Sequence, residues 1–289
     1  MTEAFDGDWL DQREPFDAMA RDIDLAVRLA DALPARPRIL DLGAGTGSLF
    51  RWLAPLIGRA QAWTLVDADI RLIERAFDTI ADRADEIGLT VTMPGRRTML
   101  VHAPGGAWRI EGLIADLNGA PGNLPLVNAD AVVNSALCDL VSEDWVQRMA
   151  AGLAVRRIPF YAALNVSGRD VFTPPHRADA LVARGFRRDQ LRDKGFSGRA
   201  LGPAAPAAIA AAFAARGFAV ATAPSDWRIP RQASAMAADL ATGHTDAAMQ
   251  QEHRHRAAIG AWEAARLRQA MEGRLSVRVG HRDVLALPG

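Results

Sequence analysis

Three glycines at alternate positions follow a short apolar run in residues 39–47, Ile-Leu-Asp-Leu-Gly-Ala-Gly-Thr-Gly. The apolar run predicts a buried strand that carries Asp41 to the end of a sheet. Gly43 and Gly45 permit a tight turn and a close approach of the backbone to a ligand, and Gly47 lets the following helix sit close. In a doubly wound sheet, this first turn from strand to helix is where nucleotide-like ligands bind.

Three classes of ligand can be compared on these residues. A phosphate-binding loop requires Gly-Lys-Ser or Gly-Lys-Thr, and the segment contains no lysine. A dinucleotide fingerprint requires a third glycine where this chain has Ser48, and the charge of Asp41 would repel a pyrophosphate. An acid at that position suits a ligand with a cationic amino acid end, and S-adenosylmethionine is such a ligand.

The segment resembles motif I of the class I S-adenosylmethionine-dependent methyltransferases. The match runs over residues 39–49, and the wider resemblance covers residues 38–166 well and the rest in outline. It implies a transferase activity with S-adenosyl-L-methionine as the cofactor. The motif residues that it places beside the cofactor are Asp41, Gly43, Ala44, Gly45 and Gly47.

The same resemblance assigns roles to residues that follow later strands. It implies that Asp67, with Ala68 beside it, binds both ribose hydroxyls, since a carboxylate accepts two O–H bonds well. Asp116 would receive the adenine amino group, and Leu117 would lie against the adenine ring. Asn134 matches motif IV, beside the transferred methyl group. The alternative is that the two acids only form turns or helix entries and that the asparagine only binds backbone.

The N-terminal segment offers one more contact with the cofactor. Many relatives fold an N-terminal helix over the bound cofactor, so Arg13 is expected to reach the methionine carboxylate and Phe16 to cover the ligand. The alternative for Arg13 is a surface position at the start of a helix.

Residues for the methyl acceptor are less clearly marked. Methyl transfer is an in-line displacement that depends mainly on placement, and a base is needed only when the acceptor must lose a proton. Asp139 is the candidate catalytic base or substrate anchor, and its alternative role is to cap the helix near Glu143. Cys138 is expected to be a small core residue, while Asp226 and Trp227 are candidates for the wall of the acceptor pocket.

Alternating strand and helix patterns predict an α/β fold with a doubly wound, Rossmann-like, mostly parallel seven-stranded sheet, helices on both faces, and helical and lid insertions. The strands are expected at residues 38–42, 62–66, 108–115, 131–134, 159–166, 218–223 and 281–287. A helix at residues 9–33 belongs to an N-terminal helical lid, residues 1–37, and residues 38–289 form the methyltransferase domain. Its insertions are expected at about 89–105, as a hairpin; at 168–203, as a loop-rich lid; and at 232–272, as two helices that break near Gly243.

Composition limits the partners. The chain has 34 basic and 34 acidic residues, and this balance argues against a nucleic-acid partner. One cysteine excludes an intramolecular disulfide, and six dispersed histidines predict no metal site. The N-terminus does not resemble a signal peptide, and no run reaches 18 apolar residues, so we expect no membrane contact and a cytoplasmic protein.

The sequence therefore favours a methyltransferase for a small-molecule acceptor, because the insertions would enclose a pocket. An RNA or protein methyltransferase is the second reading. Strand four lacks the Asp/Asn-Pro-Pro-Tyr/Phe tetrapeptide of amino-group methylation and the Pro-Cys pair of the RNA cytosine enzymes. A protein that binds S-adenosylmethionine without transferring its methyl group is the third. The acceptor, the atom methylated and the oligomeric state stay open.

Overall fold

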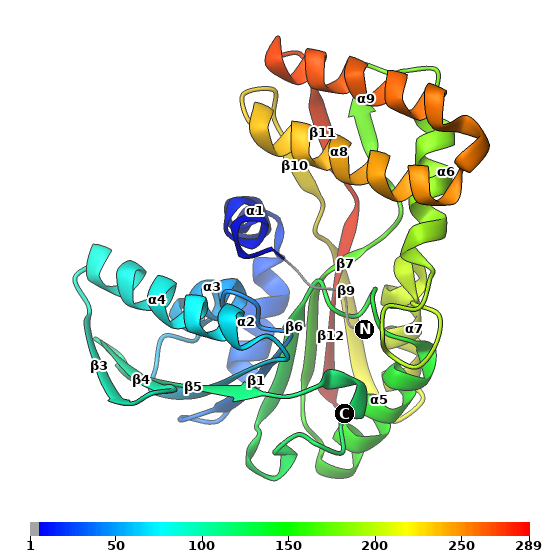
Figure 1. The fold of residues 1–289 in the computed structure, drawn as a ribbon. Helices are drawn as coiled ribbons and strands as arrows, with labels where there is room; N and C mark the ends of the chain where they lie inside the picture. Colours follow the sequence, from blue (N-terminus) through cyan, green and yellow to red (C-terminus); the bar gives the residue numbers. More distant parts are fainter. Residues whose placement is uncertain (1–5) are drawn as a thin grey trace.

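The computed structural model describes residues 6–289, so the first part of the predicted lid, residues 1–5, lies outside the described chain. A large mixed sheet forms its centre (Figure 1). The strands of this sheet are β1 (Arg38–Leu42), β2 (Gln61–Asp67), β3 (Thr90–Gly95), β4 (Thr98–Ala103), β5 (Gly106–Ile114), β6 (Ala131–Ser135), β7 (Phe160–Val166), β9 (Phe218–Pro224) and β12 (His281–Pro288). Their order across the sheet is β3-β4-β5-β2-β1-β6-β7-β12-β9.

The predicted seven-stranded sheet is too small. The seven expected strands are present, and β5, β2, β1, β6 and β7 run parallel. However, the hairpin expected as an insertion pairs with β5 through β4, so the sheet has nine strands. This pairing hydrogen-bonds the edge of β5 and buries Met99 and Val101 of β4. At the other edge β12 lies antiparallel between β7 and β9, which makes the sheet mixed.

Helices cover both faces of the sheet. The α-helices of the described chain are α1 (Gly7–Ala20), α2 (Ile23–Ala32), α3 (Ser48–Ile57), α4 (Ile70–Glu86), α5 (Glu143–Arg156), α6 (Asp179–Gln190), α7 (Ala205–Ala214), α8 (Ser234–Gln251) and α9 (Arg256–Met271). Short 3-10 turns are η1 (Leu117–Gly119), η2 (Leu126–Asn128), η3 (Gly202–Ala204) and η4 (His253–His255). Helices α2, α3 and α4 pack on one face, and α5 and α7 pack on the other.

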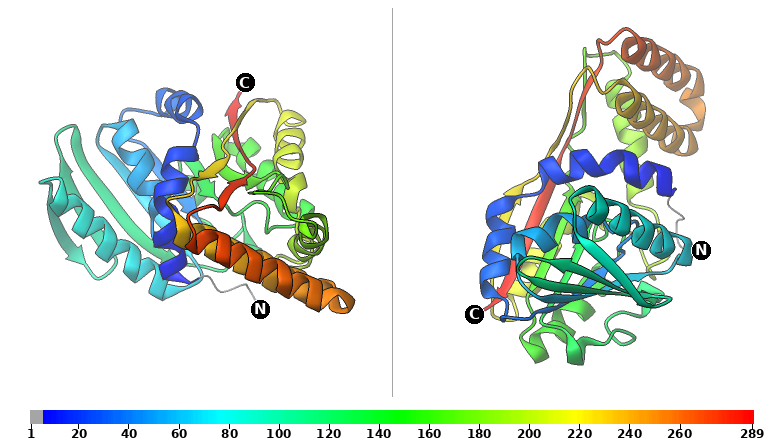
Figure 2. Two further views of the ribbon diagram at one scale, coloured as in Figure 1. Left: turned by 90° about the horizontal axis from the view of Figure 1, so that it is seen from above. Right: turned by 90° about the vertical axis from the view of Figure 1, so that its left-hand side faces the viewer.

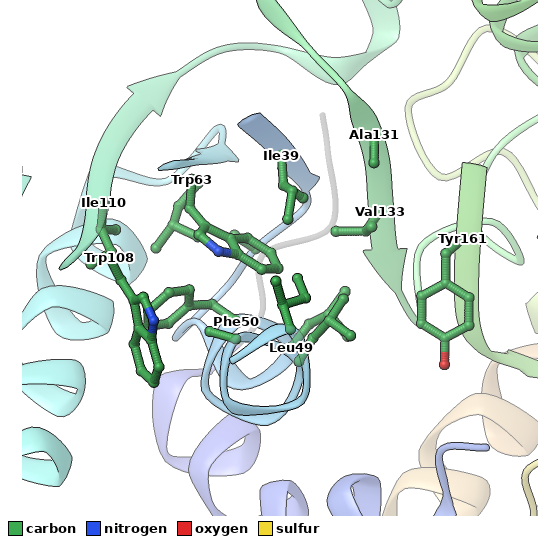
Figure 3. Packing of buried hydrophobic residues seen from close by; sticks show 14 of the residues in the cluster. Ile39, Leu49, Phe50, Trp63, Trp108, Ile110, Ala131, Val133 and Tyr161 are labelled. Carbon is green, nitrogen blue, oxygen red and sulfur yellow. The ribbon is translucent and has the colours of Figure 1, made fainter. Parts of the chain in front are cut away.

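Alternation along the strands divides the core into two layers. In β6, Ala131 and Val133 point to the face covered by α3, and Val132 points to the face covered by α5. Figure 3 shows the first layer, where Phe50 of α3 packs edge-on against the Trp63 ring at a centroid distance of 5.2 Å. This packing sets the position of the loop between β1 and α3.

The N-terminal helix is interrupted, contrary to the single helix expected over residues 9–33. Helix α1 ends at Ala20, and Asp22 caps α2 by accepting the Leu25 N–H at 2.8 Å. The break turns the chain. As a result α1 lies across the carboxyl ends of the central strands, while α2 packs on a face of the sheet (Figures 1 and 2).

Helices α6, α8 and α9 pack on a small sheet beyond the central one (Figure 1). That sheet has the order β10-β11-β8, from β8 (Val171–Thr173), β10 (Trp227–Ile229) and β11 (Ser276–Val279). Two expectations were wrong here. Residues 179–190 form the helix α6, which packs on α8. Gly185 permits this close approach, since a Cβ on Gly185 would lie 2.7 Å from the Cα of Ala248. Helix α8 continues through Gly243 and ends at Gln251 instead.

Within residues 6–289, no helix combines the length and the hydropathy that a membrane span requires.

The carboxyl group of Asp283 ties the C-terminal strand to two other elements. It is fully buried and accepts hydrogen bonds from the Tyr161 hydroxyl at 2.8 Å, the Leu164 N–H at 2.8 Å and the Asp22 N–H at 2.9 Å. Leu164 has a φ of 55°, at an irregularity in the pairing of β7 with β12. Burial raises the pKa of Asp283, and the hydrogen bonds that it accepts oppose this shift.

Replacing Asp283 should therefore be costly. We expect Asp283→Ala to lower the free energy of unfolding by about 3 kcal/mol, because buried donors lose their acceptor. Tyr161→Phe removes one hydrogen bond and should cost about 1 kcal/mol. Urea denaturation of both variants measures the difference, and equal losses would contradict the role of Asp283 as a shared acceptor.

Candidate functional site

The glycine loop, residues 43–47, is held in place by the end of β2. The N–H groups of Gly43 and Ala44 donate to the Val66 carbonyl at 2.8 and 3.1 Å, and the Gly45 N–H donates to the Asp67 carboxylate at 2.9 Å. Because these amides are used within the protein, the loop does not offer the free N–H groups that bind phosphates in other glycine-rich loops. The loop instead forms the floor of a cavity.

The glycines have different roles. Gly43 and Gly45 line the cavity with φ values of 65° and 54°, in the left-handed region that favours glycine. Gly47 does not line the cavity, and so a direct contact with the cofactor is not supported there. A Cβ on Gly47 would lie 3.3 Å from the Cβ of Ala76, so this glycine serves the packing of α3 against α4.

Asp41 is the most unusual group of the cavity. It is 1% exposed, and neither carboxyl oxygen has a hydrogen-bond partner among residues 6–289. Burial raises its pKa from 3.8 to about 8; the charge of Arg21 opposes that shift and the charge of Asp67 adds to it. A buried, unpaired carboxyl group that lines a cavity fits a cationic ligand group.

Asp67 lies at the end of the neighbouring strand and lines the same cavity, as does Ala68. Its carboxylate accepts N–H groups from Gly45 at 2.9 Å and from Asp69 at 3.0 Å. Burial raises its pKa, and these backbone hydrogen bonds oppose the shift. Each oxygen still has a second lone pair, so the carboxylate can accept two hydroxyl groups from a ligand.

Asp116 and Leu117 form the next part of the wall. The Asp116 side chain accepts the Asn118 N–H at 2.9 Å, which starts η1 and leaves the carboxylate exposed. The Leu117 carbonyl accepts the indole N–H of Trp145 at 2.7 Å. This bond to α5 holds the buried Leu117 side chain against the cavity.

Besides Gly47, two further predicted site residues do not line the cavity. Asn134 is fully buried and its side-chain oxygen accepts the thiol of Cys138 at 3.4 Å, so it lies behind the wall that Ser135 forms. Asp139 is absent from the cavity wall, and its backbone carbonyl accepts the N–H of Gly202 at 2.8 Å. Its catalytic role stays a prediction. Cys138 is buried, and burial raises the pKa of its thiol.

Helix α1 lies over the cavity. Arg13 lines it, but the guanidinium is already paired with Asp17 at 3.2 Å and stacked over the Trp227 ring at 4.7 Å. Leu10 covers the glycine loop, with its Cδ1 atom 3.0 Å from the position of a Gly45 Cβ. The Phe16 ring packs against the helical insertion and does not line the cavity, so its expected place over the ligand stays a prediction.

The other candidates for the acceptor wall lie behind α1. The Trp227 indole N–H donates to Asp17 at 3.0 Å, and the Asp226 carboxylate binds the Arg278 side chain at 2.9 Å. Neither Asp226 nor Trp227 lines the cavity. Trp227 supports α1 from outside it, and Asp226 joins β11 and the start of β12, since it also accepts the His281 N–H at 3.0 Å.

A buried arginine that the sequence did not single out stands behind this wall. Arg21 follows α1, and its side chain is fully buried. Its guanidinium donates to the hydroxyls of Ser48 at 2.9 Å and Ser135 at 3.1 Å, and lies 3.6 Å from Asp17. Both serines line the cavity. The sequence signal that could have identified Arg21 is its position at the break between α1 and α2.

The segment after α6 closes the remaining side. Lys194 and Phe196, from the predicted lid, line the cavity together with Leu137 and Leu140. Lys194 is 6% exposed and binds Asp189 at 2.9 Å. The enclosed space is about 380 Å³, within the range of small-molecule sites. Among residues 6–289, no group of three His, Cys, Asp or Glu side chains is arranged to hold a metal ion.

No protein-family model matches this sequence, and no curated protein matches it. Among solved structures, a cyclopropane-fatty-acyl-phospholipid synthase-like protein from Lactobacillus casei is similar, with a TM-score of 0.53 and 12% identity over 96% of this chain and 100% of that chain. The chain therefore shares the overall fold of that protein. A cyclopropane synthase from Mycobacterium tuberculosis matches with a TM-score of 0.42 and 16% identity, over 91% and 82% of the two chains.

The raised pKa of Asp41 predicts how stability depends on pH. A carboxyl group whose pKa is higher in the folded chain than in the unfolded chain binds protons more tightly when folded. Its contribution is therefore fully present below pH 4 and is lost as the pH rises to about 8. Asp41→Asn removes this loss, so we expect the variant to be more stable than the wild type at pH 8 and nearly equal to it near pH 4. Thermal unfolding without ligand across this range measures the effect, and parallel profiles would contradict it.

Proposed function

We propose that this chain is an S-adenosylmethionine-dependent methyltransferase that acts on a small-molecule acceptor. The observation that carries the proposal is the Asp41 carboxyl group, which is buried without a hydrogen-bond partner in the wall of the cavity. A ligand ammonium group satisfies both its charge and its lone pairs. A phosphate group does not, because its charge is negative and four amides of the loop, those of Gly43, Ala44, Gly45 and Gly47, are already bonded within the protein.

The rest of the cofactor fits the same cavity. Asp67 offers two carboxylate oxygens to the ribose hydroxyls, and Leu72 and Leu117 offer apolar surface to the adenine ring. We assign Asp116, which is exposed in the cavity wall, to the adenine amino group. Arg13 stays our candidate for the methionine carboxylate, which would then compete with Asp17 for the guanidinium.

The acceptor side of the cavity supports a small and partly apolar substrate. Ala136, Leu137, Leu140 and Phe196 provide apolar surface, and Lys194 provides a buried ammonium group. Asp139 does not line the cavity. We therefore attribute the rate of methyl transfer to placement of the acceptor in line with the methyl group, since placement can lower the activation barrier by several kcal/mol. The cofactor supplies an electrophilic methyl on a sulfonium, and the acceptor supplies the electron pair.

The direct test is binding of S-adenosylhomocysteine, followed by a labelled-methyl transfer screen against metabolite fractions. We expect micromolar binding to the wild type and at least tenfold weaker binding to Asp67→Asn, which loses one carboxylate oxygen as an acceptor. Asp78→Asn, an exposed change on α4, is the matched control and should bind normally. Below pH 8, binding should release a proton from Asp41, detected by calorimetry in buffers of different ionisation enthalpy. A failure to bind in the micromolar range would contradict the proposal.

The position of α1 over the cavity also supports the predicted N-terminal lid, at least for residues 6–37. Ion pairs hold α1 down on both sides: Glu14 binds Arg51 of α3 at 2.8 Å, and Asp11 binds Arg75 of α4 at 2.8 Å. Gln12 donates to Asp239 of α8 at 2.7 Å. For the cofactor to enter or leave, α1 must move and these bonds must break.

Weakening one ion pair should therefore speed release of the ligand. We expect Glu14→Gln to raise the dissociation rate of S-adenosylhomocysteine about three- to tenfold, because a partly buried ion pair contributes roughly 1 kcal/mol. Stopped-flow fluorescence measures this rate. Glu74→Gln, on the exposed side of α4, makes the same charge change away from α1. Equal rates for the two variants would show that α1 does not gate the cavity.

A further inference from the structure

A second cavity of about 180 Å³ lies within the helical insertion. Its wall comes from β8, α6, α8 and α9, and it shares no lining residue with the first cavity. The methyltransferase proposal assigns it no role. Its walls and its charges together indicate the chemistry of a ligand.

The walls are aromatic. The Phe186 ring stacks on His244 at a centroid distance of 3.8 Å, and Phe172 meets Trp262 edge-on at 5.1 Å. All four rings line the space. A dry cavity of about 150 Å³ is known to hold benzene, so this one has room for a single aromatic ring with a short substituent. Flat apolar walls favour such a ring over a flexible chain.

The two carboxylates of the wall are already engaged. Asp179 accepts the Trp262 indole N–H at 2.6 Å and is paired with the buried guanidinium of Arg266. Asp170 lies 3.1 Å from Nε2 of His244. Both acids therefore already have partners within the protein.

The arginine of the wall has no such partner in the described chain. Arg187 of α6 lines the cavity, is exposed, and forms no ion pair within residues 6–289. Gln190 lines the cavity one helical turn later and offers an amide N–H beside it. A planar guanidinium and an amide at the rim match a carboxylate, which an arginine can bind with two parallel hydrogen bonds.

We propose that this cavity is a second binding site, for a small aromatic carboxylate. The ring lies between the aromatic walls, and the carboxylate meets Arg187 at the rim. The proposal is independent of the methyltransferase assignment, because it concerns different residues and is tested without the cofactor. The rival chemistry is an aromatic cation, since aromatic walls also attract cations; the positive charge of Arg187 disfavours it.

Ligand-observed NMR on the full chain without cofactor tests the site with three probes of similar size: benzoate, cyclohexanecarboxylate and phenyltrimethylammonium. We expect benzoate to bind with a dissociation constant on the order of 0.1–1 mM, given its few heavy atoms. The saturated acid, which cannot stack, should bind several-fold more weakly, and the cation should not bind. Preference for the cation, or no binding of benzoate at 10-fold above the expected constant, would overturn the proposal.

Two variants locate the site. Arg187→Gln should weaken benzoate binding at least fivefold, and Arg177→Gln, which removes the same charge from an exposed residue outside the cavity wall, should leave it unchanged. Ala183→Trp fills the mouth from α6 and should abolish binding. Because Arg187 is exposed, its variant keeps the test decisive if the tryptophan variant does not fold. Benzoate binding that neither variant changes would place the ligand elsewhere and overturn the proposal.

Discussion

The buried guanidinium of Arg21 holds the N-terminus, the glycine loop and the central strands together. It donates to Ser48 at the start of α3 and to Ser135 at the end of β6, and it lies near the acids Asp17 and Asp41. A cation in such a place needs both hydrogen bonds and negative charge, because burying it alone would cost several kcal/mol. The chain must therefore turn at this residue, and that turn sends α1 across the cavity.

The two halves of the cavity are built with different rigidity. The half that includes Asp41 and Asp67 belongs to the central strands, where backbone hydrogen bonds hold the loop and each strand is buried on both faces. The other half comes from α1 and from the segment around Lys194, which are held by side-chain ion pairs. The first half is therefore suited to a ligand group of fixed shape, and the second half can adapt to ligand groups of different shapes.

Helix α6 connects the two cavities. Its inward face carries Val182, Phe186 and Gln190 along the second cavity, and the chain then continues directly to Lys194 and Phe196 in the first. A change in the position of this helix would reach both cavities.

Local patterns in the sequence were sufficient to predict seven strands of the central sheet and the glycine loop. They also placed Asp41, Asp67 and Asp116 at the carboxyl ends of neighbouring strands, because a strand end and its next turn lie within a few residues. The strands β8 and β10 were not predicted. Other placements depend on packing in the folded chain that a local pattern does not show. Asn134 faces Cys138 and the interior, and its motif position could not show this. Residues 168–203 were expected to be rich in loops, and the helix α6 within them packs on α8, where Ala248 lies against Gly185. The hairpin joined the sheet because β5 was an open edge, and an insertion is not marked in the sequence as a strand partner.

The helical insertion enters through β10 and leaves through β11, and these strands are hydrogen-bonded neighbours, with Trp227 opposite Val279. The two ends of residues 230–276 are therefore about 5 Å apart, the spacing of paired strands. A segment whose ends meet can be lengthened, shortened or replaced without moving the strands on either side. Changes within residues 230–276 can thus reshape the part of the second cavity that α8 and α9 form, and the bond from Asp239 to α1, while the β1 and β2 ends that carry Asp41 and Asp67 keep their places.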